Sequence, residues 1–249
     1  MIPYSGLRLD LPRMDTLSVE KKVRTPDIRT VADMAPVLRE PITLSGTTPA
    51  YFMYREAAKT EHLPLFFRHG IRFDITILPE LFLGSEYNKT FGHYHPDAPS
   101  GIPYPELYEV VTGQAHYLLQ KRAEKSEKIE SAMLVKTDAG QKALMPPGFG
   151  HVTVNTGGLL VMDNLVERTF QSNYAPYKEN HGAAYYWTRN GLEKNPHYSK
   201  LPPLEEINAP ELNRRYLETW QEKMEKNNNY ELFVKHPEAF EFLEDFCRS

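Results

Sequence analysis

Between residues 71 and 166 the chain is a succession of short apolar segments separated by turn residues. Isoleucine and phenylalanine occupy every second position of 71–77, with polar side chains between them, which is the period of a β-strand. A further strand is expected within 81–90. No interval between the segments offers a crossover helix, which parallel neighbours would need. The pattern therefore predicts an all-β sandwich or barrel.

Three further pairs of segments read as β-hairpins, because turn residues separate two short apolar runs in each. The paired runs are 106–111 with 115–122 around Thr-Gly-Gln, 132–136 with 142–145 around Thr-Asp-Ala-Gly, and 151–155 with 159–166 around Thr-Gly-Gly.

The two ends of the chain have a different character. Prolines recur through 1–60 and exclude long helices there, although 30–39 allows a short one. We expect an N-terminal arm over 1–60, a β core over 61–200 and a helical extension over 201–249, all within one domain.

The helical extension is expected to begin at Asn208, which precedes a proline in the first turn. Four apolar or aromatic residues then recur every fourth position, as on one helical face. They are Leu212, Tyr216, Trp220 and Met224. Pro237 is expected to open a second short helix.

Charge and cysteine content narrow the function classes. Lys plus Arg number 29 and Asp plus Glu 33, giving a net charge of −4, which argues against a nucleic-acid-binding protein. No apolar run approaches the ~20 residues of a membrane span, and the first residues do not resemble a signal peptide. Cys247 is the only cysteine and cannot form an internal disulfide. We expect a cytoplasmic protein without a membrane or nucleic-acid partner.

Histidines and a carboxylate carry the clearest chemical signal. His93 and His95 stand at i and i+2, so on a strand both imidazoles point to one side. Glu106 shares a face with Tyr108 on the next strand, and His151 begins a strand after a rigid Pro-Pro-Gly turn. On strands of one sandwich these side chains can converge.

Three imidazoles and one carboxylate occupy four positions of an octahedron and leave two adjacent positions open, as a catalytic metal centre requires. These mixed nitrogen and oxygen donors suit Fe(II), Mn(II), Ni(II) or Zn(II), and match Ca²⁺ poorly.

Motifs over residues 70–166 resemble the cupin superfamily, and within it the cupin-type glucose-6-phosphate isomerases first recognised in archaea. The resemblance rests on Gly-His-Tyr-His at 92–95, Glu-Leu-Tyr-Glu at 106–109, Pro-Pro-Gly-Phe-Gly-His at 146–151 and Thr-Val-Asn-Thr-Gly at 153–157.

This resemblance implies a jelly-roll barrel, a homodimer and interconversion of glucose 6-phosphate and fructose 6-phosphate, a step of glycolysis and gluconeogenesis. It implies one divalent metal ion per subunit, with Fe(II) preferred and Mn(II), Ni(II) or Zn(II) as alternatives. The implied ligands are His93, His95, Glu106 and His151. The implied substrate contacts are Thr76, Thr90 and Gly92 near the phosphate and Tyr108 near the sugar.

The sequence departs from the family pattern in two places. The segment 96–105 is longer than in the archaeal proteins, which makes Asp97 and Glu109 rivals of Glu106 as the carboxylate ligand. Extra residues in 166–190 displace the later sugar-contacting positions. The candidates there, by proximity in sequence, are His181, Tyr185 and Tyr186.

Two mechanisms remain open for such an isomerase, a proton transfer and a hydride shift. Glu106 would either move the proton between C1 and C2 or act as a metal ligand only. A hydride shift between the two carbons would need no base. A bound metal would polarise the carbonyl and stabilise a developing enediolate. An acidic chain must also supply local donors for a phosphate; Lys89 is a candidate, although a solvated position is expected for it.

Three other functions fit the same residues. The metal centre would also serve an isomerase of another sugar phosphate or an iron dioxygenase. The barrel would also serve as a non-enzymatic sugar-binding module. The threonines expected near a phosphate count against oxygen chemistry, and an open coordination site counts against pure binding.

Overall fold

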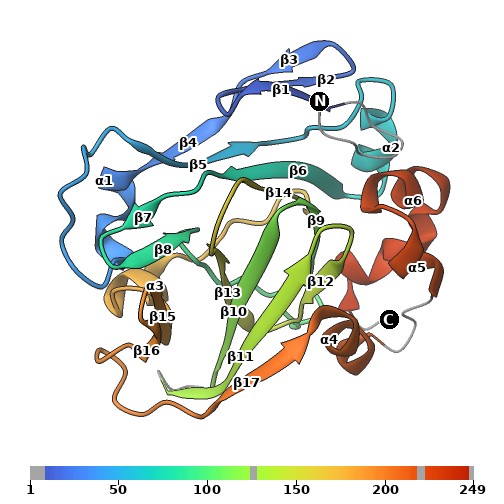
Figure 1. Ribbon diagram of the computed structural model, residues 1–249. Helices are drawn as coiled ribbons and strands as arrows, with labels where there is room; N and C mark the ends of the chain where they lie inside the picture. Colours follow the sequence, from blue (N-terminus) through green and yellow to red (C-terminus); the bar gives the residue numbers. More distant parts are fainter. Residues whose placement is uncertain (1–8, 124–127, 218–221, 247–249) are drawn as a thin grey trace.

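The computed structural model describes residues 9–123, 128–217 and 222–246 (Figure 1). Its strands are β1 (Leu9–Arg13), β2 (Thr16–Val19), β3 (Lys22–Arg24), β4 (Asp27–Thr30), β5 (Pro49–Tyr54), β6 (Ile71–Leu78), β7 (Phe82–Leu83), β8 (Glu86–Lys89), β9 (Glu106–Thr112), β10 (Gln114–Arg122), β11 (Ile129–Asp138), β12 (Lys142–Met145), β13 (Phe149–Asn155), β14 (Leu160–Glu167), β15 (Tyr185–Thr188), β16 (Gly191–Lys194) and β17 (Leu204–Asn208). Its helices are α1 (Val31–Met34), α2 (Leu63–Arg68), α3 (Ala175–Glu179), α4 (Ala209–Tyr216), α5 (Glu222–Lys226) and α6 (Asn229–Lys235), with 3₁₀ turns η1 (Ala35–Val37) and η2 (Pro237–Leu243).

Two facing sheets form the barrel. One runs in the order β12-β9-β14-β6-β5-β4, and the other follows β16-β15-β8-β13-β10-β11-β17, with β7 beside β8. The pairs are antiparallel except for β11 with β17. Figure 1 shows β4, β5 and β6 crossing above the strands β10, β11 and β13. The expected all-β jelly-roll barrel is confirmed.

The three predicted hairpins are wrong, although their strands exist. β9 pairs with β12 and β14, whereas β10 pairs with β11 and β13, so β9 and β10 belong to opposite sheets. The same holds for β11 with β12 and for β13 with β14. Gly113 and Gly158 turn the chain with φ of +85° and +69°. These short turns carry the chain across the barrel edge because both sheets must bury an inner face.

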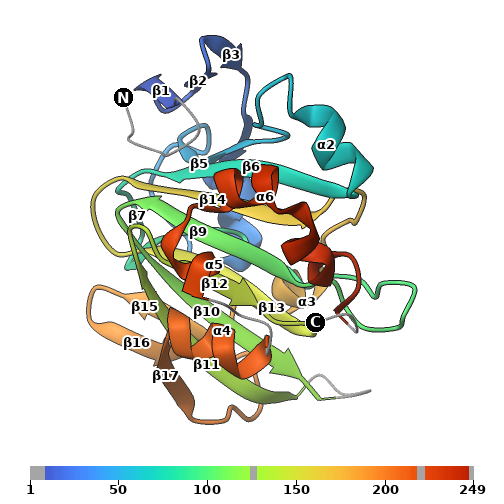
Figure 2. The same cartoon turned by 90° about the vertical axis from the view of Figure 1, so that its right-hand side faces the viewer.

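Both faces of β6 are buried, which differs from the half-buried strand that its period suggests. Phe73, Ile75 and Ile77 point outward and pack with Phe66 of α2 and Phe233 of α6. Figure 2 shows α6 lying across this sheet. The polar residues between them therefore face the interior of the barrel, where Arg72 and Thr76 line a pocket described below.

The N-terminal segment contributes to the barrel. β1, β2 and β3 form a small separate sheet, but β4 and β5 join the six-stranded one. Thr30 caps α1 within the predicted helical segment, with Asp33 completing a capping box. The division of the chain at residues 60 and 200 remains a prediction. β17, which lies after residue 200, pairs with β11 of the barrel.

From Ala209 onward the described C-terminal residues form helices, as predicted, whereas Leu204–Asn208 of the predicted helical extension form strand β17. Asn208 caps α4 by accepting a hydrogen bond from the Glu211 amide at 2.9 Å. The four residues predicted to share one helical face do not lie on one described helix. Tyr216 ends α4, Met224 belongs to α5, and Trp220 lies outside the described residues. Pro237 opens the 3₁₀ turn η2, while α6 was not expected.

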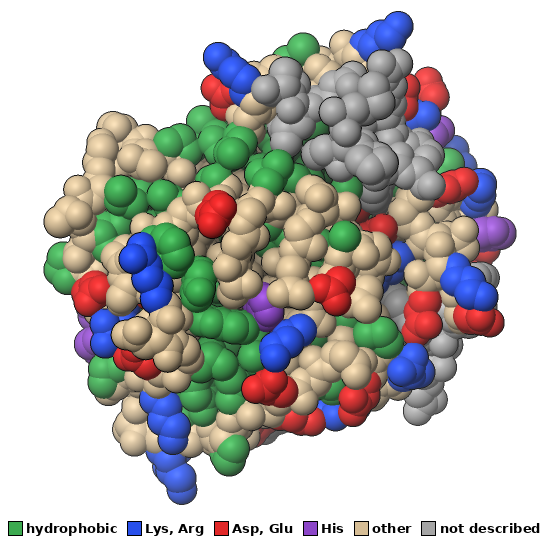
Figure 3. Space-filling model, in the orientation of Figure 1, with side chains coloured by type: hydrophobic (Ala, Val, Ile, Leu, Met, Phe, Trp, Pro, Cys, Tyr) green, Lys and Arg blue, Asp and Glu red, His purple; other side chains and the backbone are tan. Residues whose placement is uncertain are grey.

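No described helix has both the length and the hydropathy needed to cross a membrane. On the described part of the face in Figure 3, acidic and basic side chains are interspersed among apolar ones, so this face presents no broad field of one sign.

Candidate active site

Four side chains from three segments converge inside the barrel. Nε2 of His95 lies 3.1 Å from Nε2 of His93 and 3.3 Å from Oε2 of Glu106. Nε2 of His151 lies 3.2 Å from the same oxygen. All four ligand atoms lie within 4.8 Å of one another. Donors bound to one ion at about 2.1 Å and at right angles would be about 3.0 Å apart, so this set fits a single metal ion.

Backbone pairing holds the histidines together. The amides and carbonyls of His93 and His151 exchange hydrogen bonds at 3.3 and 3.1 Å, so the two residues are directly opposite. Glu106 enters from the other sheet at the start of β9. The barrel closure therefore brings the carboxylate to the histidines.

Three atoms of the cluster are buried and form no hydrogen bond of normal geometry with the described residues: Oε2 of Glu106 and both ring nitrogens of His151. Two of them, Oε2 of Glu106 and Nε2 of His151, face each other at 3.2 Å. An unsatisfied buried polar atom costs about 1–3 kcal/mol. A divalent cation at the centre of the cluster would satisfy both atoms, which supports a metal site.

The protonation states also suit a metal. Burial, followed by the neighbouring His151 and His95, holds the pKa of His93 well below its usual value. Burial likewise lowers the pKa of His151. Burial alone would raise the pKa of Glu106, but the close contacts with His151 and His95 outweigh it and hold that pKa well below normal. Neutral imidazoles and an ionised carboxylate are the forms that bind cations.

The structure brings Glu106, rather than its rivals, to the histidines. Asp97 is exposed in the long 96–105 loop and pairs with Pro103 through its backbone. Glu109 points to the opposite face of β9, where it accepts a hydrogen bond from the Asn229 amide. The position of each carboxylate follows the alternation of β9.

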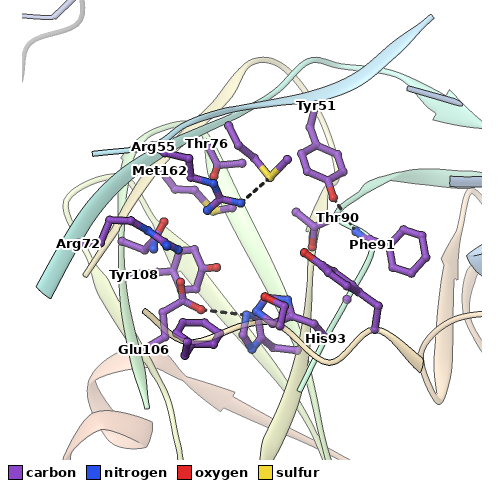
Figure 4. Close-up of a pocket in the computed structure, with 17 residues that line it drawn as sticks. Tyr51, Arg55, Arg72, Thr76, Thr90, Phe91, His93, Glu106, Tyr108 and Met162 are labelled. Carbon is purple, nitrogen blue, oxygen red and sulfur yellow. Dashed lines mark hydrogen bonds and ion pairs between the residues drawn. The ribbon is translucent and has the colours of Figure 1, made fainter. Parts of the chain in front are cut away.

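A cavity of about 530 Å³, counting the open solvent at its mouth, lies over the cluster. Figure 4 shows its labelled side chains pointing inward from both sheets. Its lining is Tyr51, Met53, Arg55, Arg72, Thr76, Thr90, Phe91, Gly92, His93, Glu106, Tyr108, His151, Met162, Asn164, Phe170, Ser172 and Tyr174.

The four substrate contacts predicted on strands and motifs all line this cavity: Thr76, Thr90, Gly92 and Tyr108. Thr90 Oγ1 accepts a hydrogen bond from the Thr153 amide at 2.9 Å, which leaves its hydroxyl hydrogen for another acceptor.

Gly92 permits the chain to pass beside the cluster. Its φ is +85°, and an added Cβ would lie 2.5 Å from Cγ2 of Val152 and 2.7 Å from the Tyr177 ring. Only glycine fits this conformation and space.

His181, proposed as a substrate contact, does not line the cavity. Its ring lies 4.3 Å from that of His197, beyond α3. Tyr185 and Tyr186 are also absent from the lining. The chain instead presents Phe170 and Tyr174 before α3, because the extra residues fold as a segment leading into that helix.

The positions of the cationic side chains differ most from those expected. Lys89 is buried, pairs with Glu86 and lies 5.2 Å from the centre of the Tyr186 ring, so it is neither solvated nor in the pocket lining. Arg55 and Arg72 line the pocket and were not expected there. Arg72 shares the strand face of Thr76, so the period of β6 contained the signal.

Comparison with known proteins adds a family. The glucose-6-phosphate isomerase (GPI) family is matched over residues 28–201. No curated protein matches the chain.

Solved structures give weak likenesses only. A Bacillus subtilis oxalate decarboxylase variant is 13% identical over 50% of this chain and 26% of its own, with a TM-score of 0.33. A Lactobacillus farciminis oxalate decarboxylase formate complex is 17% identical over 53% and 32%, with a TM-score of 0.36. Brassica napus procruciferin, an 11S globulin, is 13% identical over 50% and 27%, with a TM-score of 0.34. The chain spans about a quarter to a third of these proteins' length.

TM-scores of this size carry no argument about function. The family match, in contrast, takes in most of the barrel and all four residues of the cluster. The chain therefore belongs to the glucose-6-phosphate isomerase (GPI) family.

Proposed function

We propose that this protein is a metal-dependent aldose–ketose isomerase that interconverts glucose 6-phosphate and fructose 6-phosphate. The observation that carries the proposal is the cluster of His93, His95, Glu106 and His151 at the base of a pocket lined by hydroxyl and cationic groups. The family match supports the same reaction.

The cluster would hold one divalent ion, with Fe(II) preferred and Mn(II), Ni(II) or Zn(II) as alternatives. When bound, the ion would supply Lewis-acid polarisation of the substrate oxygens at C1 and C2.

Glu106 is the proposed base. Going from aldose to ketose, the carbon-bound proton of C2 moves to C1 and the hydroxyl proton of O2 moves to O1, so the reaction needs no oxidant. The low pKa of Glu106 keeps the carboxylate ionised, so that its oxygens are available as proton acceptors.

Tyr108 is proposed to hold the sugar. Burial and then the neighbouring Glu106 raise the pKa of Tyr108 well above its usual value. The phenol therefore stays protonated and donates a hydrogen bond to a substrate oxygen. Thr76, Thr90 and the Gly92 amide are proposed to donate to the phosphate end.

Three further properties are proposed. A homodimer and a role in glycolysis and gluconeogenesis rest on the family resemblance, whereas a cytoplasmic location rests on the single cysteine of the sequence.

The test is a coupled assay of fructose 6-phosphate conversion, run anaerobically on chelator-stripped protein and after adding each metal in turn. We expect turnover to disappear on stripping and to return with one metal. Stoichiometric metal binding without isomerisation would contradict the proposed reaction. Oxygen uptake and other sugar phosphates would then be measured.

A further inference from the structure

Two arginines place positive charge in the pocket beside the metal cluster. Arg55 directly follows β5, and Arg72 lies on the neighbouring strand β6. Both line the cavity, and Figure 4 shows their guanidinium groups on one side of it. β5 and β6 are paired through Tyr54 and Ile75, so the sheet fixes the position of Arg72 and of the residue before Arg55.

One buried carboxylate orients both guanidinium groups. Asp74 Oδ2 accepts hydrogen bonds from Nη1 of Arg55 at 2.7 Å and from Nε of Arg72 at 2.8 Å. Its Oδ1 accepts from the Glu56 amide at 2.9 Å. Asp74 is fully buried, so these contacts are shielded from water. The carboxylate is thus committed to holding the arginines in place.

The arrangement leaves a surplus of positive charge. Two guanidinium groups share one buried carboxylate, and the second acidic neighbour, Asp27, is exposed and 3.6 Å from Arg55 Nε. Such an exposed contact is strongly screened. Among the described residues, Nη2 of Arg55 donates to the thioether of Met53 at 3.2 Å, which is a weak acceptor.

The sheet register sets the distance to the metal cluster. Val166 of β14 pairs with Arg72 on one side and with Glu106 on the other. Arg72 therefore lies two strand spacings, about 10 Å, from the carboxylate ligand. A sugar phosphate held at the cluster by its C1 and C2 oxygens extends its phosphate end in this range.

We propose that Arg55 and Arg72 bind the phosphate group of the sugar-phosphate substrate, with Asp74 as the positioning residue. This inference rests on the proposed function and names the groups that neutralise the substrate. A phosphate monoester carries about −1.5 to −2 charges. Hydroxyl and amide donors contribute no net charge, whereas a guanidinium supplies charge and two parallel donors.

The test compares Arg55→Gln and Arg55→Lys with the parent protein. We expect Arg55→Gln to raise the KM for fructose 6-phosphate and the inhibition constant of inorganic phosphate about 10- to 100-fold, the loss of a charge-assisted hydrogen bond. The kcat and metal content should change little. Arg55→Lys should fall between, because it keeps the charge and loses the paired donors. Arg214→Gln, on α4, is the matched control, since this exposed arginine pairs with Glu225 and should leave both constants unchanged.

Calorimetric binding of inorganic phosphate to the metal-loaded protein separates this inference from the reaction. Phosphate binding that Arg55→Gln abolishes, in a protein without isomerase activity, would support the anion site and contradict the reaction. Active protein with parental KM and phosphate affinity in Arg55→Gln would overturn the inference alone. If Arg55→Gln fails to fold, unchanged constants in both Arg55→Lys and Arg72→Lys would overturn it.

Discussion

His95 donates a hydrogen bond from Nδ1 to the carbonyl oxygen of Tyr104 at 2.7 Å. A carbonyl can only accept, so in the neutral ring the proton is on Nδ1 and the lone pair of Nε2 points to the cluster. The long 96–105 loop, which weakened the carboxylate assignment at the level of sequence, thus orients a proposed metal ligand.

Removing one imidazole should abolish metal binding and turnover together. We expect His151→Ala to lose metal because three remaining donors bind one ion much more weakly. Metal content by elemental analysis and the isomerase assay check this, with His197→Ala, an exposed histidine outside the pocket, as control. Full activity in metal-depleted His151→Ala would refute the metal mechanism.

Thr90→Val should weaken substrate binding without affecting the metal. The loss of one hydrogen bond to a charged phosphate, about 1.5–3 kcal/mol, predicts a KM raised about 10- to 100-fold. Thr90→Ser keeps the hydroxyl and should retain the parental KM. A drop in metal content in Thr90→Val would show that the threonine supports the cluster instead.

Gly92→Ala should destabilise the fold through collision as well as backbone strain. A Cβ at Gly92 would lie 2.5 Å from Val152, whereas Gly101, with a similar φ of +81°, has no neighbour within 4 Å. We expect Gly101→Ala to cost about 1 kcal/mol and Gly92→Ala about 1–3 kcal/mol more. Urea unfolding of both variants measures the difference; equal losses would exclude the collision.

His116 should make stability depend on pH. Burial, with a smaller contribution from Lys136, lowers its pKa from 6.5 to about 4. The unfolded chain therefore binds more protons between these values, so this contribution is complete above about pH 6.5 and is lost as the pH falls. At pH 5 the loss is about 2 kcal/mol.

Urea unfolding at pH 7 and pH 5 tests the histidine term. His116→Gln, which does not titrate, should lose about 2 kcal/mol less than the parent over this interval. An identical pH dependence in parent and variant would show that His116 is not responsible.

Asn213 should anchor α4 to the barrel. Its side chain accepts from the Leu144 amide and donates to the Lys142 carbonyl, both at 2.8 Å and buried. Asn213→Ala would leave two backbone groups of β12 unsatisfied and cost about 2 kcal/mol or more. The neighbouring Arg214→Ala, exposed on the same helix, should change the unfolding free energy by less than about 0.5 kcal/mol.

Local pattern was enough for the strands and for the metal cluster. The two-residue spacing placed His93 with His95, although both lie outside the named strands and His93 forms an isolated bridge to His151. Glu106 was put on the face opposite Glu109 because side-chain direction on a strand depends on parity. The cap at Asn208 followed from local hydrogen bonding for the same reason.

These local patterns did not predict which strands pair. A Thr-Gly-Gln turn is compatible with a hairpin, yet β9 and β10 enter opposite sheets, because the choice depends on which distant strands bury each inner face. The position of His181 was likewise set by where α3 packs, which no local signal specified.

The sequence by itself determined the β architecture and the four candidate metal ligands, since these follow from short-range periodicity and spacing, while the resemblance to a family supplied the hydroxyl groups near them. Only the tertiary structure decided which face of β6 is the outside. α2 and α6 cover Phe73 and its apolar neighbours, so Arg72, Asp74 and Thr76 turn inward. Arg72 and Thr76 line the site for this reason: burying the apolar face of β6 under helices distant in the chain leaves the polar face of the same strand to the pocket.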